Sequence, residues 1–150
     1  MTSEIVTCPV CGKRNRVPAA APGVPRCGQC HSSLPWIATA TDEDASEVID
    51  QSAIPVLLDL WAPWCGPCRM VSPALEELAR SHAGRIKLVK VDVDQAPGVA
   101  QRFEVLGIPT LVVLDRGRVV ARQTGAAPAP ALAAWLDQAL ADLPAASPTP

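Results

Sequence analysis

The six cysteines of this 150-residue chain all fall in C-x-x-C pairs, and this pattern limits the fold more than any other feature. The pairs are Cys8 with Cys11, Cys27 with Cys30, and Cys65 with Cys68. The first ten residues, MTSEIVTCPV, include Glu4 and no apolar h-region, so we expect no secretory signal peptide. In a chain without an export signal, such pairs indicate metal or redox sites before they indicate structural disulfides.

Composition excludes several broad classes of function. Hydrophobic residues make up 49% of the chain and charged residues 19%, so most of it is able to bury a core. The net charge of −2 argues against a general nucleic-acid binder. The strongest apolar run, residues 56–60, is interrupted by Asp59 and is far shorter than the roughly 20 residues of a membrane helix. We therefore expect a cytoplasmic, monomeric protein that binds neither nucleic acid nor membrane.

The first four cysteines have the spacing of a zinc ribbon. Cys8 and Cys11 form one knuckle, Cys27 and Cys30 form a second, and fifteen residues separate the two. Four thiolates in this arrangement supply a closed tetrahedral site, which predicts one structural Zn²⁺ and no catalytic metal. Residues 1–35 have little to bury, so the metal would supply their folding energy, on the order of 10–16 kcal/mol. Gly12 and Gly28 are expected to let the backbone turn toward the sulfurs.

Three other interpretations of these cysteines remain open at this point. Cys27-Gly-Gln-Cys30-His31 matches the attachment motif of c-type haem, although haem leaves Cys8 and Cys11 without a role. His31 could also replace one cysteine as a zinc ligand. The four cysteines could instead pair as structural disulfides.

From residue 36 onward, hydrophobic periodicity predicts an α/β fold with a mixed sheet. Residues 36–142 are expected to form this domain, and residues 143–150 a disordered tail. The expected helices begin at Thr41, at Gly66 (ending near His82), at Pro97 (ending near Phe103) and at Pro130 (ending near Asp142), and the expected strands are 54–60, 86–93, 111–114 and 119–123.

The third pair lies where a buried strand ends and a helix begins. Backbone N–H groups and the helix dipole stabilise a thiolate at this position, so Cys65 is predicted to be the nucleophile, with an exposed sulfur. Cys68, one turn into the helix, is placed to resolve a mixed disulfide. Gly66 and Pro67 hold the turn tight, and the absence of a cationic residue between the cysteines favours a reductant. A third zinc knuckle is a poor alternative, because no further pair of ligands remains.

Three more residues belong to the predicted site. Asp59 interrupts a strand buried on both faces, where desolvation raises its pKa and fits it to exchange a proton with Cys68 through water. Lys90 lies on the next strand and is expected to pair with Asp59, although a lysine on the surface is an alternative. A cis bond before Pro109 would expose backbone for a substrate chain to pair against, but a cis bond is not predictable from sequence.

These residues resemble the thioredoxin family. The matching segments are DLWAPWCGPCR at 59–69, KVD at 90–92, GIPT at 107–110, and Gly125. Together with the four N-terminal cysteines, the pattern is similar to the zinc-ribbon-bearing bacterial thioredoxin 2 type. Leu60 stands where many thioredoxins carry phenylalanine, a difference that concerns core packing and not the chemistry.

The resemblance implies a thioredoxin fold preceded by a small N-terminal zinc ribbon, and a protein-disulfide reductase. It implies that Cys65 attacks, that Cys68 resolves, that Asp59 is the buried acid, and that Pro109 is a cis-proline facing the disulfide. The expected substrate-binding residues are Trp64, Gly66, Pro67, Gly107, Ile108 and Gly125. Electrons are expected from NADPH through thioredoxin reductase, the substrates are disulfide-containing client proteins, and no redox cofactor is bound. An adaptor or holdase that uses this domain only to dock clients is the alternative.

Overall fold

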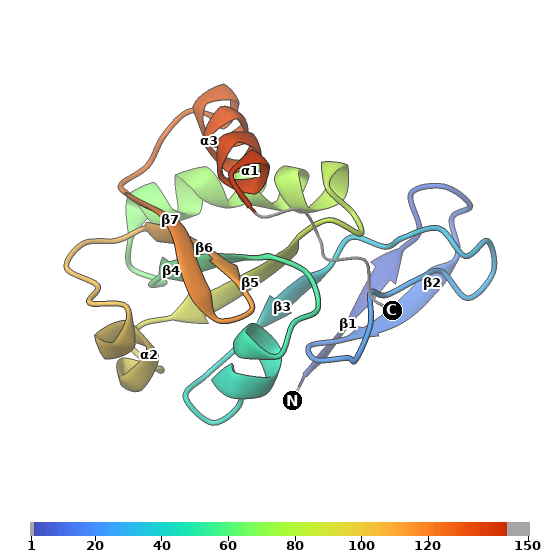
Figure 1. The fold of residues 1–150 in the computed structure, drawn as a ribbon, viewed down its shortest axis with the longest axis horizontal. Helices are drawn as coiled ribbons and strands as arrows, with labels where there is room; N and C mark the ends of the chain where they lie inside the picture. The colour runs from blue at the N-terminus through green and yellow to red at the C-terminus, as the bar shows by residue number, and fades with distance from the viewer. Residues whose placement is uncertain (1, 144–150) are drawn as a thin grey trace.

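A five-stranded mixed sheet forms the centre of the protein, whose computed structural model describes residues 2–143 (Figure 1). The strand order is β3 (Ile37–Thr39), β5 (Lys87–Asp92), β4 (Val56–Trp61), β6 (Thr110–Asp115) and β7 (Arg118–Thr124). The first three strands are parallel, and β6 and β7 continue the sheet in antiparallel pairing. A separate antiparallel hairpin, β1 (Ser3–Thr7) with β2 (Arg14–Pro18), lies beside the β3 edge.

Helices cover both faces of the large sheet. α1 (Gly66–Ser81) and α3 (Ala129–Ala141) pack on one face, where Leu57, Leu88 and Leu111 belong to their hydrophobic cluster. A π-helix, η1 (Ser46–Asp50), and α2 (Pro97–Arg102) cover the other face. The expected α/β class with a mixed sheet is therefore confirmed, and β4 is buried along its length because it is paired on both edges and covered on both faces.

The helix expected after Thr41 differs from the observed structure. Residues 42–44 form turns, and the helical segment is the short π-helix η1. Asp42, expected in a first helical turn, instead accepts hydrogen bonds from the backbone N–H groups of Gly98 (2.9 Å) and Val99 (2.8 Å). Its carboxylate thus caps the start of α2, whose unpaired N–H groups it satisfies.

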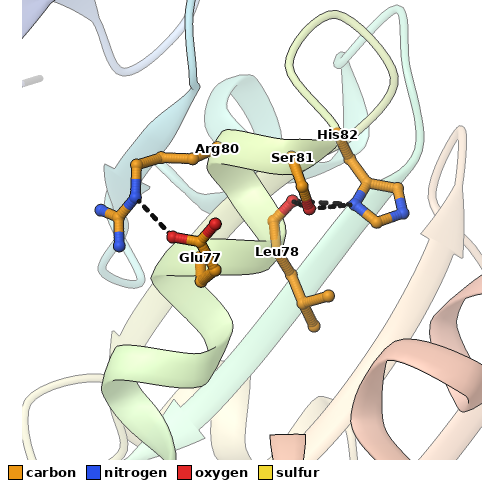
Figure 2. A network of polar contacts seen from close by, with 5 residues as sticks. All are labelled: Glu77, Leu78, Arg80, Ser81 and His82. Atoms are coloured by element: carbon orange, nitrogen blue, oxygen red, sulfur yellow. Dashed lines mark hydrogen bonds and ion pairs between the residues drawn. The ribbon is translucent and has the colours of Figure 1, made fainter. Parts of the chain in front are cut away.

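A polar network ends α1 and connects it to α3. Figure 2 shows Ser81 and His82 turned toward the carbonyl of Leu78, whose oxygen lies 2.9 Å from His82 Nδ1. The other ring nitrogen, Nε2, lies 2.9 Å from a carboxylate oxygen of Asp137 on α3. His82 is buried, and its ring adds a contact to the Leu78 carbonyl, which already accepts the His82 backbone N–H at 2.9 Å.

The N-terminal segment shares a hydrophobic cluster with the sheet domain. Leu34 and Trp36, on either side of the expected boundary, are each 1% exposed and belong to the cluster that also contains Cys8 and Cys27. The indole Nε1 of Trp36 donates to the carbonyl of Pro18 at 3.0 Å. Residues 2–35 are therefore packed against the rest of the protein by the buried Trp36 side chain, which contacts both parts.

Lys87, in β5, is a fully buried lysine that the sequence analysis did not single out. Its ammonium group lies 4.1 Å from the centre of the Trp36 ring and donates to the carbonyl of Val48 in η1 at 2.6 Å. Burial lowers the pKa of Lys87 to about 8, although the nearby Asp44 opposes this change. The charge is thus held between an aromatic face and a carbonyl at the junction of three segments.

Two further expectations concern the C-terminal tail and membrane-spanning helices. Apart from Leu143, the expected tail of residues 143–150 lies outside the described residues. Within residues 2–143, the structure contains no helix with the length and hydropathy needed to span a membrane.

The first prediction concerns the stability of Lys87→Met. Since the folded protein releases this proton near pH 8 and the unfolded chain holds it until about pH 10.5, Lys87 makes stability rise with pH between those values. The variant lacks that rise, so its free energy of unfolding relative to the wild type should fall by on the order of 3 kcal/mol from pH 7 to pH 10. Urea unfolding in the presence of a reductant measures this difference.

Lys13→Met, which removes an exposed lysine, controls for the loss of one positive charge. A difference between Lys87→Met and wild type that stays constant over this pH range would contradict the prediction.

Candidate functional site

A disulfide between Cys65 and Cys68 stands at the junction of β4 and α1. Cys65 is the N-cap residue of α1, in an extended conformation, and its sulfur accepts the backbone N–H of Cys68 at 3.1 Å. Gly66 and Pro67 occupy the first two positions of the helix, where proline costs nothing because those N–H groups have no partner in the helix. The local sequence therefore places the first sulfur where the helix start stabilises negative charge.

The two sulfurs differ in access. Cys65 is 5% exposed and Cys68 is 2% exposed, and both pack against Ala62, Trp61, Val93 and Ile108. The expectation of an exposed Cys65 sulfur is wrong for this disulfide form, in which the residue is buried. Cys65 is nevertheless the more accessible of the two, since Cys68 lies inside the first helical turn.

A cis-proline loop lies opposite the disulfide. The Ile108–Pro109 bond is cis, and the Ile108 carbonyl oxygen lies 3.9 Å from the Cys65 sulfur. The Pro109 carbonyl accepts the N–H of Gly125 at 2.8 Å, and Gly125 adopts a φ of +96° that a residue with a side chain rarely takes. Ile108, Gly107 and Gly125 are all partly exposed, so the structure brings these three expected residues to one loop cluster beside the sulfurs.

Trp64 forms the other border of the site. Its side chain is 68% exposed, and its indole N–H donates to a carboxylate oxygen of Asp94 at 2.7 Å. That hydrogen bond fixes one end of the indole while the ring stays open to solvent. Pro67 and Met70, on the first turns of α1, are also exposed next to the disulfide. An apolar rim with few charges therefore surrounds the sulfurs.

Asp59 is a buried carboxyl group beneath α1. It is 1% exposed, and its Oδ1 atom has no hydrogen-bond partner among the described residues. In β4 its side chain points to the same face as Leu57, which packs against α1. Burial raises the pKa of Asp59 to about 6, and the charge of Lys90 reduces that increase.

Lys90 does not form the expected ion pair with Asp59. The two residues are register partners in the parallel β4–β5 ladder, so their side chains share the α1 face of the sheet. The Lys90 ammonium instead donates to the Ser72 hydroxyl at 2.6 Å and lies 3.5 Å from a carboxylate oxygen of Glu76, both on α1. Both partners are available because Ser72 and Glu76 lie one turn apart on α1, so the Lys90 ammonium reaches both. Lys90 thus acts on Asp59 only through its nearby charge.

The four N-terminal cysteines converge into a second sulfur cluster. All four sulfurs lie within 4.8 Å of one another, with Cys8 3.6 Å from Cys30 and Cys11 3.5 Å from Cys27. Ligands at 2.3 Å around a tetrahedral zinc lie about 3.8 Å apart, so the donor set and its spacing fit a Zn²⁺ ion. The four cysteines are unpaired by disulfides in this structure. His31 is exposed and lies outside this group of potential metal ligands.

The two knuckles repeat one backbone geometry. The N–H of Val10 points at the Cys8 sulfur and the N–H of Gln29 points at the Cys27 sulfur, each at 3.4 Å. In each knuckle the residue after the second cysteine takes a positive φ, +80° at Gly12 and +65° at His31. The expectation for Gly28 is therefore wrong, because His31 and not Gly28 makes the second turn.

Hydrogen bonds favour the thiolate form at Cys27 and Cys30. At Cys11, a backbone hydrogen bond from Lys13 favours the thiolate, but burial and the neighbouring sulfurs outweigh it and raise the pKa to about 11. Backbone N–H groups of Cys30 and Gln29 lower the pKa of Cys27 to about 6. The Ser32 hydroxyl and backbone lower the pKa of Cys30. The Asn15 amide also contacts the Cys27 sulfur, at 3.6 Å, while its oxygen accepts the Gly28 N–H. Sequence reasoning missed Asn15 and Ser32, because only the folded knuckles bring them to the sulfurs.

Comparison with known proteins is consistent with this geometry. Residues 36–138 match the family model described as thioredoxin. The chain is 48% identical to thioredoxin of Haemophilus influenzae over 97 residues, covering 65% of this chain and 91% of the relative. It is 44% identical to thioredoxin 1 of Synechococcus elongatus over 103 residues, covering 69% and 96%.

A third relative extends further along the chain. Thioredoxin C-3 of Corynebacterium nephridii is 40% identical over 139 residues, covering 91% of this chain and 95% of the relative. A match of that length cannot fit between residue 36 and the end of the chain, so it includes much of the N-terminal segment.

The second prediction concerns the stability of Asp59→Asn. The folded protein binds a proton at Asp59 up to about pH 6, whereas the unfolded chain loses it near pH 3.8, so ionising this buried group destabilises the fold as pH rises between those values. The neutral variant should therefore be more stable than wild type at pH 7 by up to about 3 kcal/mol, and equal to it near pH 3.5. Denaturant midpoints at both pH values check this.

Glu47→Gln, at an exposed position, is the control for removing one negative charge. A variant less stable than wild type at pH 7 would show that the Asp59 carboxylate stabilises the fold.

Proposed function

This chain belongs to the thioredoxin family, and we propose that Cys65 and Cys68 carry the protein-disulfide reductase activity of that family. The observation that carries the assignment is the Cys65 sulfur at the N-cap of α1, accepting the Cys68 N–H and facing the cis Ile108–Pro109 bond. A nucleophilic sulfur, a resolving sulfur one turn away and an open backbone segment are the parts that disulfide exchange requires.

The proposed reaction moves two electrons to the client. The Cys65 thiolate attacks one sulfur of a client disulfide; the client S–S bond breaks, a mixed disulfide forms, and the departing client sulfur takes a proton from water. Cys68 then loses its proton and attacks the Cys65 sulfur. This step forms the Cys65–Cys68 disulfide of the present structure and releases the second client sulfur as a thiol.

Asp59 is the proposed acceptor for the proton of Cys68, through a water molecule. Its raised pKa of about 6 leaves it mostly ionised at neutral pH but still able to return a proton. Lys90 is a positioning residue in this scheme, because its charge limits the rise in the pKa of Asp59. The rate of client reduction by Asp59→Asn, measured against pH, tests this role: a profile identical to wild type would remove Asp59 from the chemistry.

Client segments are proposed to dock on Trp64, Gly66, Pro67, Gly107, Ile108 and Gly125, around the cis-Pro109 loop. Ile108 supports this assignment, because its N–H has no acceptor among residues 2–143 and its carbonyl contacts only the Cys65 sulfur. An extended client segment pairs with such a backbone as an added strand. Thioredoxin reductase, using NADPH, is the proposed electron donor, and a reducing compartment such as the cytoplasm suits thiols that must stay reduced.

We further propose that residues 1–35 form a zinc ribbon, residues 36–142 the thioredoxin domain, and that the chain belongs to the zinc-ribbon-bearing thioredoxin 2 type. The convergence of four sulfurs with inward-pointing N–H groups supports this, as does the long match to thioredoxin C-3. Cys8, Cys11, Cys27 and Cys30 would hold one Zn²⁺. Bound there, the ion would supply cross-linking and folding energy and no open position for catalysis.

The third prediction tests the order of attack. Cys65→Ser should abolish dithiothreitol-driven insulin reduction, whereas Cys68→Ser should accumulate mixed disulfides through Cys65, because the resolving thiol is absent. Non-reducing electrophoresis and mass spectrometry identify the trapped species. Trapping by Cys65→Ser alone would reverse the assignment, and wild-type protein that binds insulin without reducing it would favour the adaptor or holdase function.

The fourth prediction tests the metal site. Wild-type protein purified with a reductant should contain about one zinc per chain, and Cys27→Ser nearly none, because three sulfurs close the site poorly. Cys68→Ser is the matched control and should keep its zinc. During a peroxide titration, zinc should leave as the four thiols oxidise and before the sheet domain unfolds. Zinc that stays bound until the whole protein unfolds would make the site structural only.

A further inference from the structure

Leu106 is the most exposed large hydrophobic side chain among the described residues, with 99% of its surface open to solvent. It lies between the end of α2 and the cis Ile108–Pro109 bond, two residues before Ile108 and next to Gly107 of the proposed docking surface. A single exposed leucine has no meaning by itself. Its neighbours, however, give this one a role.

The backbone beside Leu106 is the open segment of the site. Ile108 contacts the Cys65 sulfur through its carbonyl, and its N–H has no acceptor within residues 2–143. A client chain paired with Ile108 advances about 6.7 Å for every two residues, which carries it past Gly107 to Leu106. In the client, the residue two positions from the one paired with Ile108 lies opposite Leu106, and the two side chains are on the same face of the strand pair, so they reach one another.

A hollow adjoins Leu106. Its volume is about 970 Å³, it opens widely to solvent, and it lies between the end of α2 and β7. The lining residues are Ala100, Gln101, Glu104, Val105, Leu106 and Arg122. The Arg122 guanidinium donates to the backbone carbonyls of Phe103 and Glu104. These hydrogen bonds fix the Arg122 side of the hollow and use the guanidinium's donors within the protein. An apolar side chain of a client can therefore rest between Leu106 and a preformed wall.

We propose that Leu106 is a specificity-determining residue, which favours client segments with a bulky apolar side chain two residues from the cysteine under attack. This inference rests on the proposed function, because it extends the same docking surface. Continuity with the Ile108 backbone argues for a client segment as the occupant. A second copy of this chain is a poorer occupant, because one leucine beside an open hollow offers far less surface than the roughly 1,200 Å² in total that stable dimers bury.

The experiment uses the full-length, zinc-loaded protein, reduced in advance and mixed with short peptides that contain one disulfide. The peptides carry either leucine or serine two residues before, or two residues after, the exposed cysteine. Second-order rate constants for loss of the peptide disulfide are measured in single turnover, which removes any contribution from a reductase. Wild-type protein should reduce the leucine peptide about tenfold faster than its serine counterpart at one of the two positions, equivalent to about 1.4 kcal/mol.

Leu106→Ser should bring this ratio to within about twofold of one, whereas Leu106→Met should preserve it because methionine offers a similar apolar surface. Val119→Ser is the matched control: it removes a 56% exposed apolar side chain from β7 and should leave the ratio as in wild type. Circular dichroism establishes that each variant is folded.

Three results would overturn the inference. One is a ratio in Leu106→Ser equal to that of wild type. Another is an unchanged ratio with a raised KM for thioredoxin reductase, which would make the reductase the occupant. The last is a wild-type dimer, detected by sedimentation, that Leu106→Ser dissociates. Failure of the proposed function is distinguishable from all three, because wild-type protein would then fail to reduce even a small aromatic disulfide such as dithiobis(nitrobenzoate).

Discussion

The hydrogen bond from the Cys68 N–H to the Cys65 sulfur is the contact on which the proposed function of this protein depends. It exists because a short turn after the end of β4 at Trp61 leads into α1, whose first N–H groups have no partner in the helix. β4 in turn holds its position because strands pair with both of its edges and helices cover both of its faces. A shift of β4 by one residue would turn Asp59 away from α1 and displace the Cys65 turn at the same time.

Both sulfur sites direct backbone N–H groups at a sulfur atom. The number and arrangement of their sulfurs nevertheless suit the two sites to different chemistry. At the start of α1 two sulfurs meet, one residue caps a helix, and the neighbouring surface is open and apolar. In the N-terminal segment two knuckles bring four sulfurs within 4.8 Å of one another. Two sulfurs alternate between thiols and a disulfide, whereas four at tetrahedral spacing suit a metal ion.

Local patterns in the sequence predicted the features that have local causes. The buried run of β4, the helix α1 and the strands β6 and β7 each depend on neighbouring residues, and the structure contains all of them. Features made by residues far apart were missed or misassigned. Asp42 caps α2 more than fifty residues away, and Lys90 reaches Ser72 and Glu76 and not its register partner. In β5 the sequence analysis singled out Lys90 and not Lys87. Hydrophobic periodicity does not show which face of a strand an aromatic ring from another segment will cover.

The same long-range packing changes how the N-terminal segment should be understood. Sequence spacing predicted a small zinc ribbon in residues 1–35, followed by a domain at 36–142. In the folded protein, Trp36 lies over the Lys87 ammonium and donates to the Pro18 carbonyl, so one indole serves both parts. Without residues 1–33, Trp36 would lose this partner and the buried charge of Lys87 would lose part of its shield from water. The segment that carries the four-cysteine cluster is therefore part of the structural support of β5, the strand that also holds Lys90 beside Asp59.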